Sequence, residues 1–303
     1  MRLTSVWRTI VKQPFHKALR EFAYNEGKLR DLNALDCRAT PGFVNKNGET
    51  KGKKSGIQRR ERDAERLAEL QELLFANAQA ADLQRSVLLI MQGMDTAGKG
   101  STITHVVGAM NPQGVRQVGF KEPTPAELKR DFLWRIRRET PKFGEIGVFD
   151  RSHYEDVLVH RVEELTPPSQ IERRYGSIRQ FEKDLVNEGT IVLKVLLLIS
   201  PEEQFERLSD RLDEPEKHWK FKPSDIDARE KWDDYIEAHQ IAVEETDKPD
   251  APWFVIPADR KWYSRLAVQQ LLIETLEALE LTWPKASFDV ETQRKRLEAT
   301  RDI

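Results

Sequence analysis

The chain has 303 residues, of which 39% are hydrophobic and 33% charged, and its formal net charge is −2. These values fit a soluble protein of one or two domains and give no global reason to expect nucleic-acid or membrane binding. No apolar run approaches the roughly 20 residues of a membrane span. Cys37 is the single cysteine, which excludes an intrachain disulfide and favours a reducing, cytoplasmic location.

Residues 1–56 are expected to form an irregular N-terminal arm with a basic loop. Five basic residues precede the first acidic residue, Glu21, but Pro14 interrupts any long helix, which favours a basic docking arm over a transit peptide. Residues 45–56 are rich in glycine and lysine and predict a loop. Its lysines are either solvated or bind a polyanion; they are Lys51, Lys53 and Lys54.

Residues 58–80 predict one long helix that serves packing, because leucines repeat at helical spacing with charged residues on the opposite face. An apolar strand follows at residues 87–91.

A glycine-rich loop after this strand predicts a phosphate site. Glycines let backbone N–H groups surround phosphate oxygens, the following helix N-terminus adds partial positive charge, and Lys99 supplies a full one. The spacing Gly-x-x-x-x-Gly-Lys fits Gly93 to Lys99. The alternative is a simple glycine-rich turn in which Lys99 is solvated.

The residue after the lysine departs from the usual loop. That position normally carries Ser or Thr as a ligand of Mg²⁺, but here it is Gly100, and Ser101 follows one residue later. Asp95, inside the loop, is a candidate substitute, because a carboxylate aimed into a phosphate site would be repelled unless a cation lay between them.

Four further strands are predicted, at residues 115–120, 144–150, 191–199 and 253–256. Ligands bind outside the carboxyl ends of the strands in an open parallel sheet, so Lys121 is well placed and Arg116 is a second candidate. Residues 127–138 predict a helix with a basic face, for which solvation is the simpler interpretation.

The strand at residues 144–150 ends in Asp150, which is typical of the metal-binding partner of a phosphate loop. A segment dense in reactive groups follows it. Arg151 is placed to clamp a transferring phosphoryl group, whereas a lone histidine such as His153 is more often structural than catalytic. Ligand spacing of the zinc kind is absent.

Residues 201–245 predict a helical, basic lid that closes over phosphates and excludes water. The alternative is a surface helical hairpin of mixed charge. A last core helix follows the strand at residues 253–256, and the residues after 281 form a charged tail.

Strands alternating with helices predict an α/β fold with an open parallel five-stranded sheet and helices on both faces. Three motifs, at residues 93–100, 149–156 and 231–235, together resemble the polyphosphate kinase 2 family, over roughly residues 27–280. The resemblance implies a P-loop kinase fold of the thymidylate-kinase type. The expected organisation is an arm at 1–56, a core at 57–282 with its lid at about 201–245, and a tail at 283–303.

The resemblance also implies reversible phosphoryl transfer from inorganic polyphosphate to ADP or AMP, with guanine nucleotides as further acceptors. Mg²⁺ is the implied cofactor, with Mn²⁺ as a substitute. The form of residues 151–158 resembles the branch that accepts AMP as well as ADP. Members of the family commonly form dimers or tetramers, so a homodimer or homotetramer is expected, with no nucleic-acid or membrane partner.

The resemblance also implies which residues form the site, through the positions that match the family's motifs. Asp95 and Asp150 match the metal-binding and phosphoryl-site carboxylates, and Lys99 and Arg151 match the phosphate-binding cations; these four are the predicted catalytic residues. Further phosphate or nucleotide contacts are expected from Gly93, Met94, Thr96, Ala97, Gly98, Gly100, Ser101, Arg116, Lys121, Tyr154, Glu155, Arg207 and Arg211. Polyphosphate contacts are expected from Lys51, Lys53, Lys54 and Lys222.

Two other functions compete with this hypothesis. An ATP-dependent nucleotide kinase of the same fold would be indifferent to polyphosphate, and the basic loop and lid argue against it. A non-catalytic nucleotide-binding protein would bind nucleotide without turnover, and it would have no need of both carboxylates.

Overall fold

The structure, a computed structural model, describes the backbone of residues 3–301 and the side chains of residues 6–301. Residues 1–2 and 302–303, at the ends of the predicted arm and tail, lie outside the described residues. Among the described residues, no helix has both the length and the apolar character needed to cross a bilayer.

Five parallel strands form the central sheet, which confirms the predicted fold class. Their spatial order is β4 (Val115–Gly119), β5 (Ile146–Asp150), β3 (Ser86–Gln92), β6 (Thr190–Leu198) and β7 (Trp253–Pro257). Met91 near the end of β3 pairs with Asp150 at the end of β5. The loops that follow β3 and β5 therefore leave the same edge of the sheet side by side.

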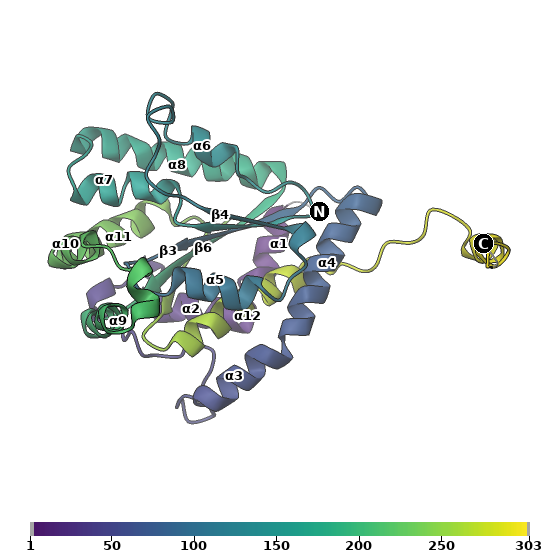
Figure 1. Cartoon of the computed structure of the whole chain (residues 1–303), viewed down its shortest axis with the longest axis horizontal. Coiled ribbons are helices and arrows are strands. Elements are labelled where there is room, and N and C mark those ends of the chain that lie inside the picture. The colour runs from purple at the N-terminus through teal and green to yellow at the C-terminus, as the bar shows by residue number, and fades with distance from the viewer. Residues whose placement is uncertain (1–2, 302–303) are drawn as a thin grey trace.

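Burial explains the apolar runs of the central strands. Every residue of β3 and β6 is buried, whereas the edge strand β4 has no buried residue. Helices cover both faces of the sheet (Figure 1), as near-continuous apolar strands require. One face carries α2 (Pro14–Ala23), α4 (Ala64–Ala80), α5 (Lys99–Val107) and α12 (Lys261–Glu277), and the other carries α6 (Trp134–Arg137), α7 (Val159–Val162), α8 (Pro168–Glu188) and α11 (Trp232–Thr246).

The prediction that residues 1–56 are irregular was wrong. The chain begins with α1 (Leu3–Ile10) and α2, and continues into a short hairpin of β1 (Tyr24–Asn25) and β2 (Lys28–Leu29) and the turn η1 (Leu32–Ala34). Pro14 occupies the first turn of α2, where proline is favoured because its missing N–H has no helical partner. Phe15, Leu19 and Ala23, four residues apart, are buried in the core.

Two predicted helices also differ from the structure. The helix expected at residues 58–80 is two helices, α3 (Lys53–Arg62) and α4, separated at Asp63, whose carboxylate accepts hydrogen bonds from Arg59, Arg62 and Gln270. Lys53 and Lys54 thus begin a helix and do not lie in a loop. Of residues 127–138 only α6 is helical, because the side chains of Thr124 and Glu127 hydrogen-bond locally in a turn.

The predicted lid has two structural parts. Its first part consists of α9 (Pro201–Asp213), η4 (Pro215–Lys220) and α10 (Ser224–Glu230) at the carboxyl edge of the sheet. The last part is α11, which packs with Ala238, Ala242 and Val243 buried and belongs to the layered core. In the tail, α13 (Val290–Glu298) has no buried residue and projects from the body (Figure 1).

Candidate active site

The loop between β3 and α5 comes very close to the neighbouring strand. Gly93 has φ of 147°, and a Cβ atom there would lie 2.6 Å from the carbonyl oxygen of Leu197. Gly98 has φ of 105° and caps α5. Glycine is therefore required at both ends of the loop. Gly93 and Gly98 both need the positive φ that glycine allows, and Gly93 also lacks space for a Cβ atom. The loop delivers the N-terminus of α5 to the carboxyl edge of the sheet, as a phosphate site requires.

Lys99 folds back across this loop. Its ammonium donates hydrogen bonds to the carbonyls of Gly93 at 2.6 Å and Met94 at 3.2 Å. Burial, together with the nearby charge of Arg151, lowers the pKa of Lys99 below its ordinary value. The side chain is thus desolvated and held inside the loop, where an anion would strengthen its charged form.

An ion pair between Asp95 and Arg151 connects the loop after β3 to the loop after β5. The Arg151 guanidinium donates to Asp95 Oδ1 at 2.7 Å, and its other terminal nitrogen lies 3.6 Å from Glu155 Oε2. Burial raises the pKa of Asp95, but Lys99 and Arg151 outweigh it, so that the pKa lies below the ordinary value. Both partners are therefore charged at neutral pH. Arg151 has φ of 64°, a left-handed conformation that non-glycine residues seldom adopt.

Asp150 places a second carboxylate beside the loop. Its Oδ2 lies 3.7 Å from the position that a Cβ atom on Gly100 would take. No cluster of three or more potential metal ligands is found among the described residues. Two carboxylates nevertheless fit Mg²⁺, which commonly takes one or two carboxylates and completes its shell with water and substrate phosphates. The hard oxygen donors of Asp95 and Asp150 suit that ion.

Arg207 lies beneath the loop and is saturated by protein groups. All five of its N–H donors are used, on Glu203 and on the carbonyls of Thr96, Ala97, Ala258 and Asp259. Its predicted phosphate contact is therefore corrected, because the buried side chain has no free donor. Its role is to hold the loop against α9 and the end of β7.

Arg211, one turn further along α9, is available to the site. It donates to Asp225 and to the Lys220 carbonyl, both at 3.0 Å, and it adds to the positive field that acts on Asp95. Lys222 lies exposed on the same segment.

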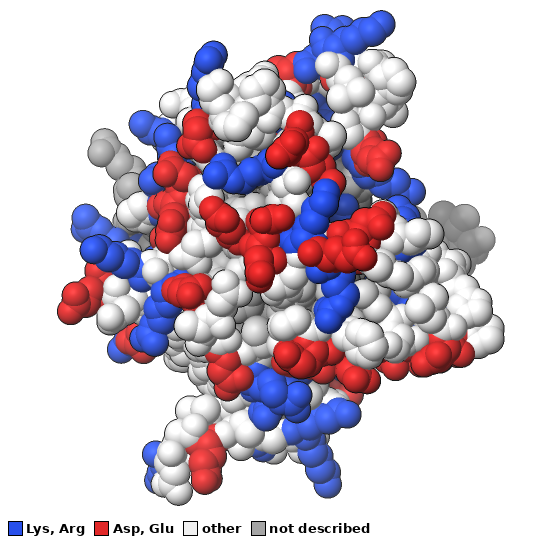
Figure 2. Space-filling model, turned by 90° about the vertical axis from the view of Figure 1, so that its left-hand side faces the viewer, with Lys and Arg blue, Asp and Glu red and all other residues white. Residues whose placement is uncertain are grey.

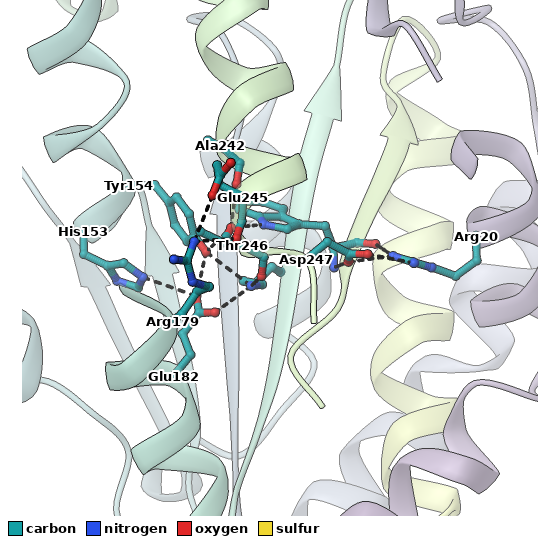
Figure 3. A network of polar contacts seen from close by, with 11 residues as sticks. Arg20, His153, Tyr154, Arg179, Glu182, Ala242, Glu245, Thr246 and Asp247 are labelled. Carbon is teal, nitrogen blue, oxygen red and sulfur yellow. Dashed lines mark hydrogen bonds and ion pairs between the residues drawn. The ribbon is translucent and has the colours of Figure 1, made fainter. Parts of the chain in front are cut away.

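The predicted phosphate or nucleotide contact of Tyr154 is also corrected. It is fully buried, and its hydroxyl donates to Glu182 at 2.7 Å within a core network that includes Thr246 and Lys194 (Figure 3). A nucleotide at the loop cannot reach it. His153 joins the same network at 3.4 Å from Glu182, which agrees with a structural role. The two residues anchor the segment that carries Arg151.

The remaining predicted residues are spread over the site and beyond it. Met94 and Ala97 are buried in the loop, and the buried Thr96 hydroxyl has no hydrogen-bond partner among the described residues. Arg116, the second residue of β4, forms an ion pair with Glu139, which lies outside the strand, and this pair does not bring Arg116 to the loop. Lys121 is exposed after β4.

Several residues outside the predicted set support the site. Gln204 on α9 donates to the Asp95 carbonyl at 3.2 Å, and Arg265 on α12 donates to Ser101 Oγ at 2.6 Å. Both reach the loop from distant segments, and nothing in their local sequence marks them. Lys194 did carry a signal, because a lone charge inside an apolar strand needs a buried partner.

A parallel sheet with a glycine loop, its lysine, and an Asp-Arg pair at the end of the adjacent strand defines the class of P-loop phosphotransferases. The model of the family described as Polyphosphate kinase 2 (PPK2) matches residues 53–283, and the chain belongs to this family.

Individual relatives agree with this assignment. An AMP/ADP-polyphosphate phosphotransferase of Meiothermus ruber is 48% identical over 220 residues, which cover 73% of this chain and 80% of that protein. An ADP-polyphosphate phosphotransferase of Rhodopseudomonas palustris is 40% identical over 280 residues, covering 88% and 93%. The crystal structure of polyphosphate kinase 2 from Arthrobacter aurescens TC1 matches with a TM-score of 0.87 and 47% identity, covering 92% of this chain and 96% of that one.

Proposed function

We propose that the protein transfers a phosphoryl group from inorganic polyphosphate to a nucleotide. The observation that carries this proposal is the meeting of Lys99, Asp95, Asp150 and Arg151 at the mouth of the glycine loop, in a chain of the polyphosphate kinase 2 family. Phosphoryl transfer needs positioning and charge neutralisation more than covalent chemistry. Two cations and two carboxylates in one place suit that requirement.

In the proposed reaction, a phosphate oxygen of the nucleotide attacks the terminal phosphorus of polyphosphate. A new P–O bond forms, the bond to the rest of the chain breaks, and the shortened chain leaves with the electron pair. Lys99 and Arg151 hold the transferring group and offset its developing negative charge. Asp95 and Asp150 would hold Mg²⁺, which would supply charge neutralisation between the two substrates.

ADP is the acceptor that both relatives share by name, and AMP is a second proposed acceptor. The name of the Meiothermus ruber relative includes AMP, and that relative has the higher identity of the two. The segment from Arg151 to Leu158, which resembles the branch that uses both acceptors, lies directly beside the loop. Guanine nucleotides, homo-oligomer formation and a cytoplasmic location stay predictions of the sequence.

The decisive experiment is a product assay with purified protein, Mg²⁺ and long-chain polyphosphate, with AMP, ADP and GDP supplied separately. ATP from ADP supports the proposed function, and ADP appearing first from AMP supports the wider acceptor range. ATP plus AMP without polyphosphate is the control; turnover only there would indicate an ATP-dependent kinase. Removal of the metal with EDTA should stop the reaction, and added Mg²⁺ or Mn²⁺ should restore it.

A further inference from the structure

The tail after α12 exposes large apolar side chains. Trp283, Phe288, Val290 and Leu297 are each between 48% and 72% exposed. The helix α13 has no buried residue, and its side-chain hydrogen bonds join near neighbours within the tail. A helix of nine residues is marginal in water without packing, and exposed apolar groups of this kind mark interaction surfaces. The tail therefore needs a surface on which to pack.

The sequence of α13 indicates the character of that surface. Val290, Arg294 and Leu297 are spaced at i, i+4 and i+7, which places them on one face of the helix. The ion pair of Arg294 is long and exposed, 3.7 Å to Glu291, and two further bases follow it in the sequence. This face is apolar with positive charge beside it, so it suits a partner surface that combines apolar and acidic groups.

A cavity with these properties lies at the carboxyl edge of the sheet and has a volume of about 750 Å³. We call it the acidic groove. Its walls are η1 with the residues that follow it, the start of α9 and the start of α11. Its apolar lining includes Leu35, Trp232 and Ile236, and its carboxylates include Asp36, Glu202, Glu206 and Asp233.

The negative charge of the acidic groove is not compensated within the chain. None of these four carboxylates forms an ion pair with another described residue, including Arg38, the one base in the described lining. Burial raises the pKa of the Cys37 thiol in the same lining to about 12, and the charges of Asp259, Asp36 and Glu202 contribute to this rise. Figure 2 shows acidic side chains gathered across the middle of the face that carries α9 and α10.

We propose that the tail docks through α13 in the acidic groove of a second copy of this chain. In Figure 1, α13 and α9 lie at opposite sides of the molecule, so both surfaces are open in one chain. Each surface complements the other in apolar character and in charge. Two copies that exchange tails reciprocally form a closed dimer, as a two-fold interface requires. The inference goes beyond the proposed function and does not depend on it.

A small cation is a weaker candidate for the acidic groove. It would neutralise the carboxylates but would leave the apolar lining and the exposed face of α13 uncovered. The described residues also contain no group of three or more side chains arranged to hold a metal ion. A helix that carries both apolar and basic side chains covers both kinds of lining at once.

The test uses full-length chains in which the charges of one surface are reversed. The tail variant carries Arg294→Glu with Arg296→Glu, and the groove variant carries Glu202→Lys with Glu206→Lys; all four positions are exposed. Sedimentation velocity over a series of protein concentrations gives the dissociation constant of the assembly. Low ionic strength keeps screening weak.

Each variant has a control with the same change in charge at exposed positions elsewhere. Lys28→Glu with Lys183→Glu, on β2 and α8, matches the tail variant. Glu65→Lys with Glu72→Lys, on α4, matches the groove variant. Both controls should assemble like the wild type, because neither alters α13 or the acidic groove.

We expect the tail variant and the groove variant each to raise the dissociation constant on the order of tenfold, because each exposed ion pair contributes up to roughly fivefold. An equimolar mixture of the two should recover wild-type assembly, since the reversed tail of one chain then meets the reversed groove of the other. Docking within a single chain could not be restored by mixing.

Three results would overturn the inference. They are a wild type that stays monomeric at every concentration, a tail or groove variant that assembles like the wild type, and a mixture that assembles no more tightly than its two components. Turnover of polyphosphate is not the readout, so failure of the proposed function would leave this test unaffected.

Discussion

The guanidinium of Arg151 lies 2.7 Å from the carboxylate of Asp95, and this ion pair links the end of β5 to the loop after β3. Residues 56 positions apart in the chain therefore act as one unit. Since Arg151 also faces Glu155, its charge is held between two carboxylates. An incoming phosphate competes with these carboxylates, and a metal ion would relieve that competition.

Lys99→Ala and Arg151→Ala should each abolish turnover with little loss of fold. A cation on the transferring group contributes on the order of 10³-fold in rate, whereas neither side chain belongs to the apolar core. The measurements are kcat with ADP and polyphosphate, and the midpoint of thermal unfolding. Near-wild-type rates would contradict the catalytic roles, and unfolded variants would show a structural role instead.

Gly93→Ala and Gly100→Ala should fail in different ways. At Gly93 an added methyl group would meet the Leu197 carbonyl at 2.6 Å in a left-handed conformation, so the variant should lose stability and activity together. At Gly100 the nearest atom is Asp150 Oδ2 at 3.7 Å, an ordinary contact. That variant should fold normally and lose rate, because the methyl group narrows the space beside Asp150. Circular dichroism and kcat separate the two outcomes.

Arg207→Gln should destabilise the fold, by roughly 3 kcal/mol. It removes five donors and leaves buried backbone carbonyls unpaired, each at a cost of about 1 kcal/mol or more. Urea unfolding measures the change, and Arg211→Gln on the same helix is the control. A stable Arg207→Gln variant with a raised KM for polyphosphate would instead support the phosphate contact that the sequence predicted for Arg207.

Glu182→Gln should cost about 3–5 kcal/mol, since it leaves the Lys194 charge buried and unpaired. The Lys194 ammonium donates to Glu182 at 2.6 Å and to the Thr246 carbonyl at 2.7 Å, and both charged side chains are almost fully buried. Adding Lys194→Met should recover much of the loss. A double-mutant cycle by urea unfolding tests this, and purely additive effects would show that the pair is not coupled.

Asp156 should make stability fall as the pH rises through about 6. Burial raises the pKa of Asp156 to about 6, and Arg174, 3.6 Å away, is too distant to offset this. The folded state then holds a proton that the unfolded chain, with a carboxyl pKa of 3.8, releases. The bound proton therefore stabilises the fold at low pH, and this stabilisation is lost above the folded pKa. The difference between the two pKa values corresponds to a change of up to about 3 kcal/mol in the free energy of unfolding.

The variant Asp156→Asn lacks that titration. Its unfolding temperature relative to the wild type should therefore rise between about pH 4.5 and about pH 7.5. A difference that stays constant over this range would show that the carboxyl is ionised throughout.

The sheet could be predicted because its signals are local. The apolar runs of β3 and β6 and the glycines before Lys99 are each contained in a few residues. The spatial order of the strands, β4-β5-β3-β6-β7, has no such local signal and comes from the structure. The charges at Asp95, Asp150 and Arg151 could be placed at one edge because parallel strands end there together.

The errors arose where partners come from distant segments. Tyr154 lies within a motif of reactive residues, yet its hydroxyl is directed into the core by Glu182 and Thr246. Arg207 carries the same charge as Arg211. Only the contacts in the folded structure show that Arg207 supports the loop from within, whereas Arg211 is a partly exposed cation. Pro14 separates α1 from α2, as predicted, but proline also begins helices, and the helix that starts at Pro14 was not predicted.

The contacts of Arg207 also restrict how the segment above the loop can move. Because its guanidinium fastens α9 to the loop and to the end of β7, the first two turns of that helix cannot swing independently of the sheet. Any hinge must lie after Arg207, and the turn at Glu214 and Pro215 is the first break in regular helix beyond it. A lid that closes over the loop would therefore be the short segment from that turn to Lys231, and closure would have to release Arg229 from the Pro201 carbonyl and the Gln204 side chain.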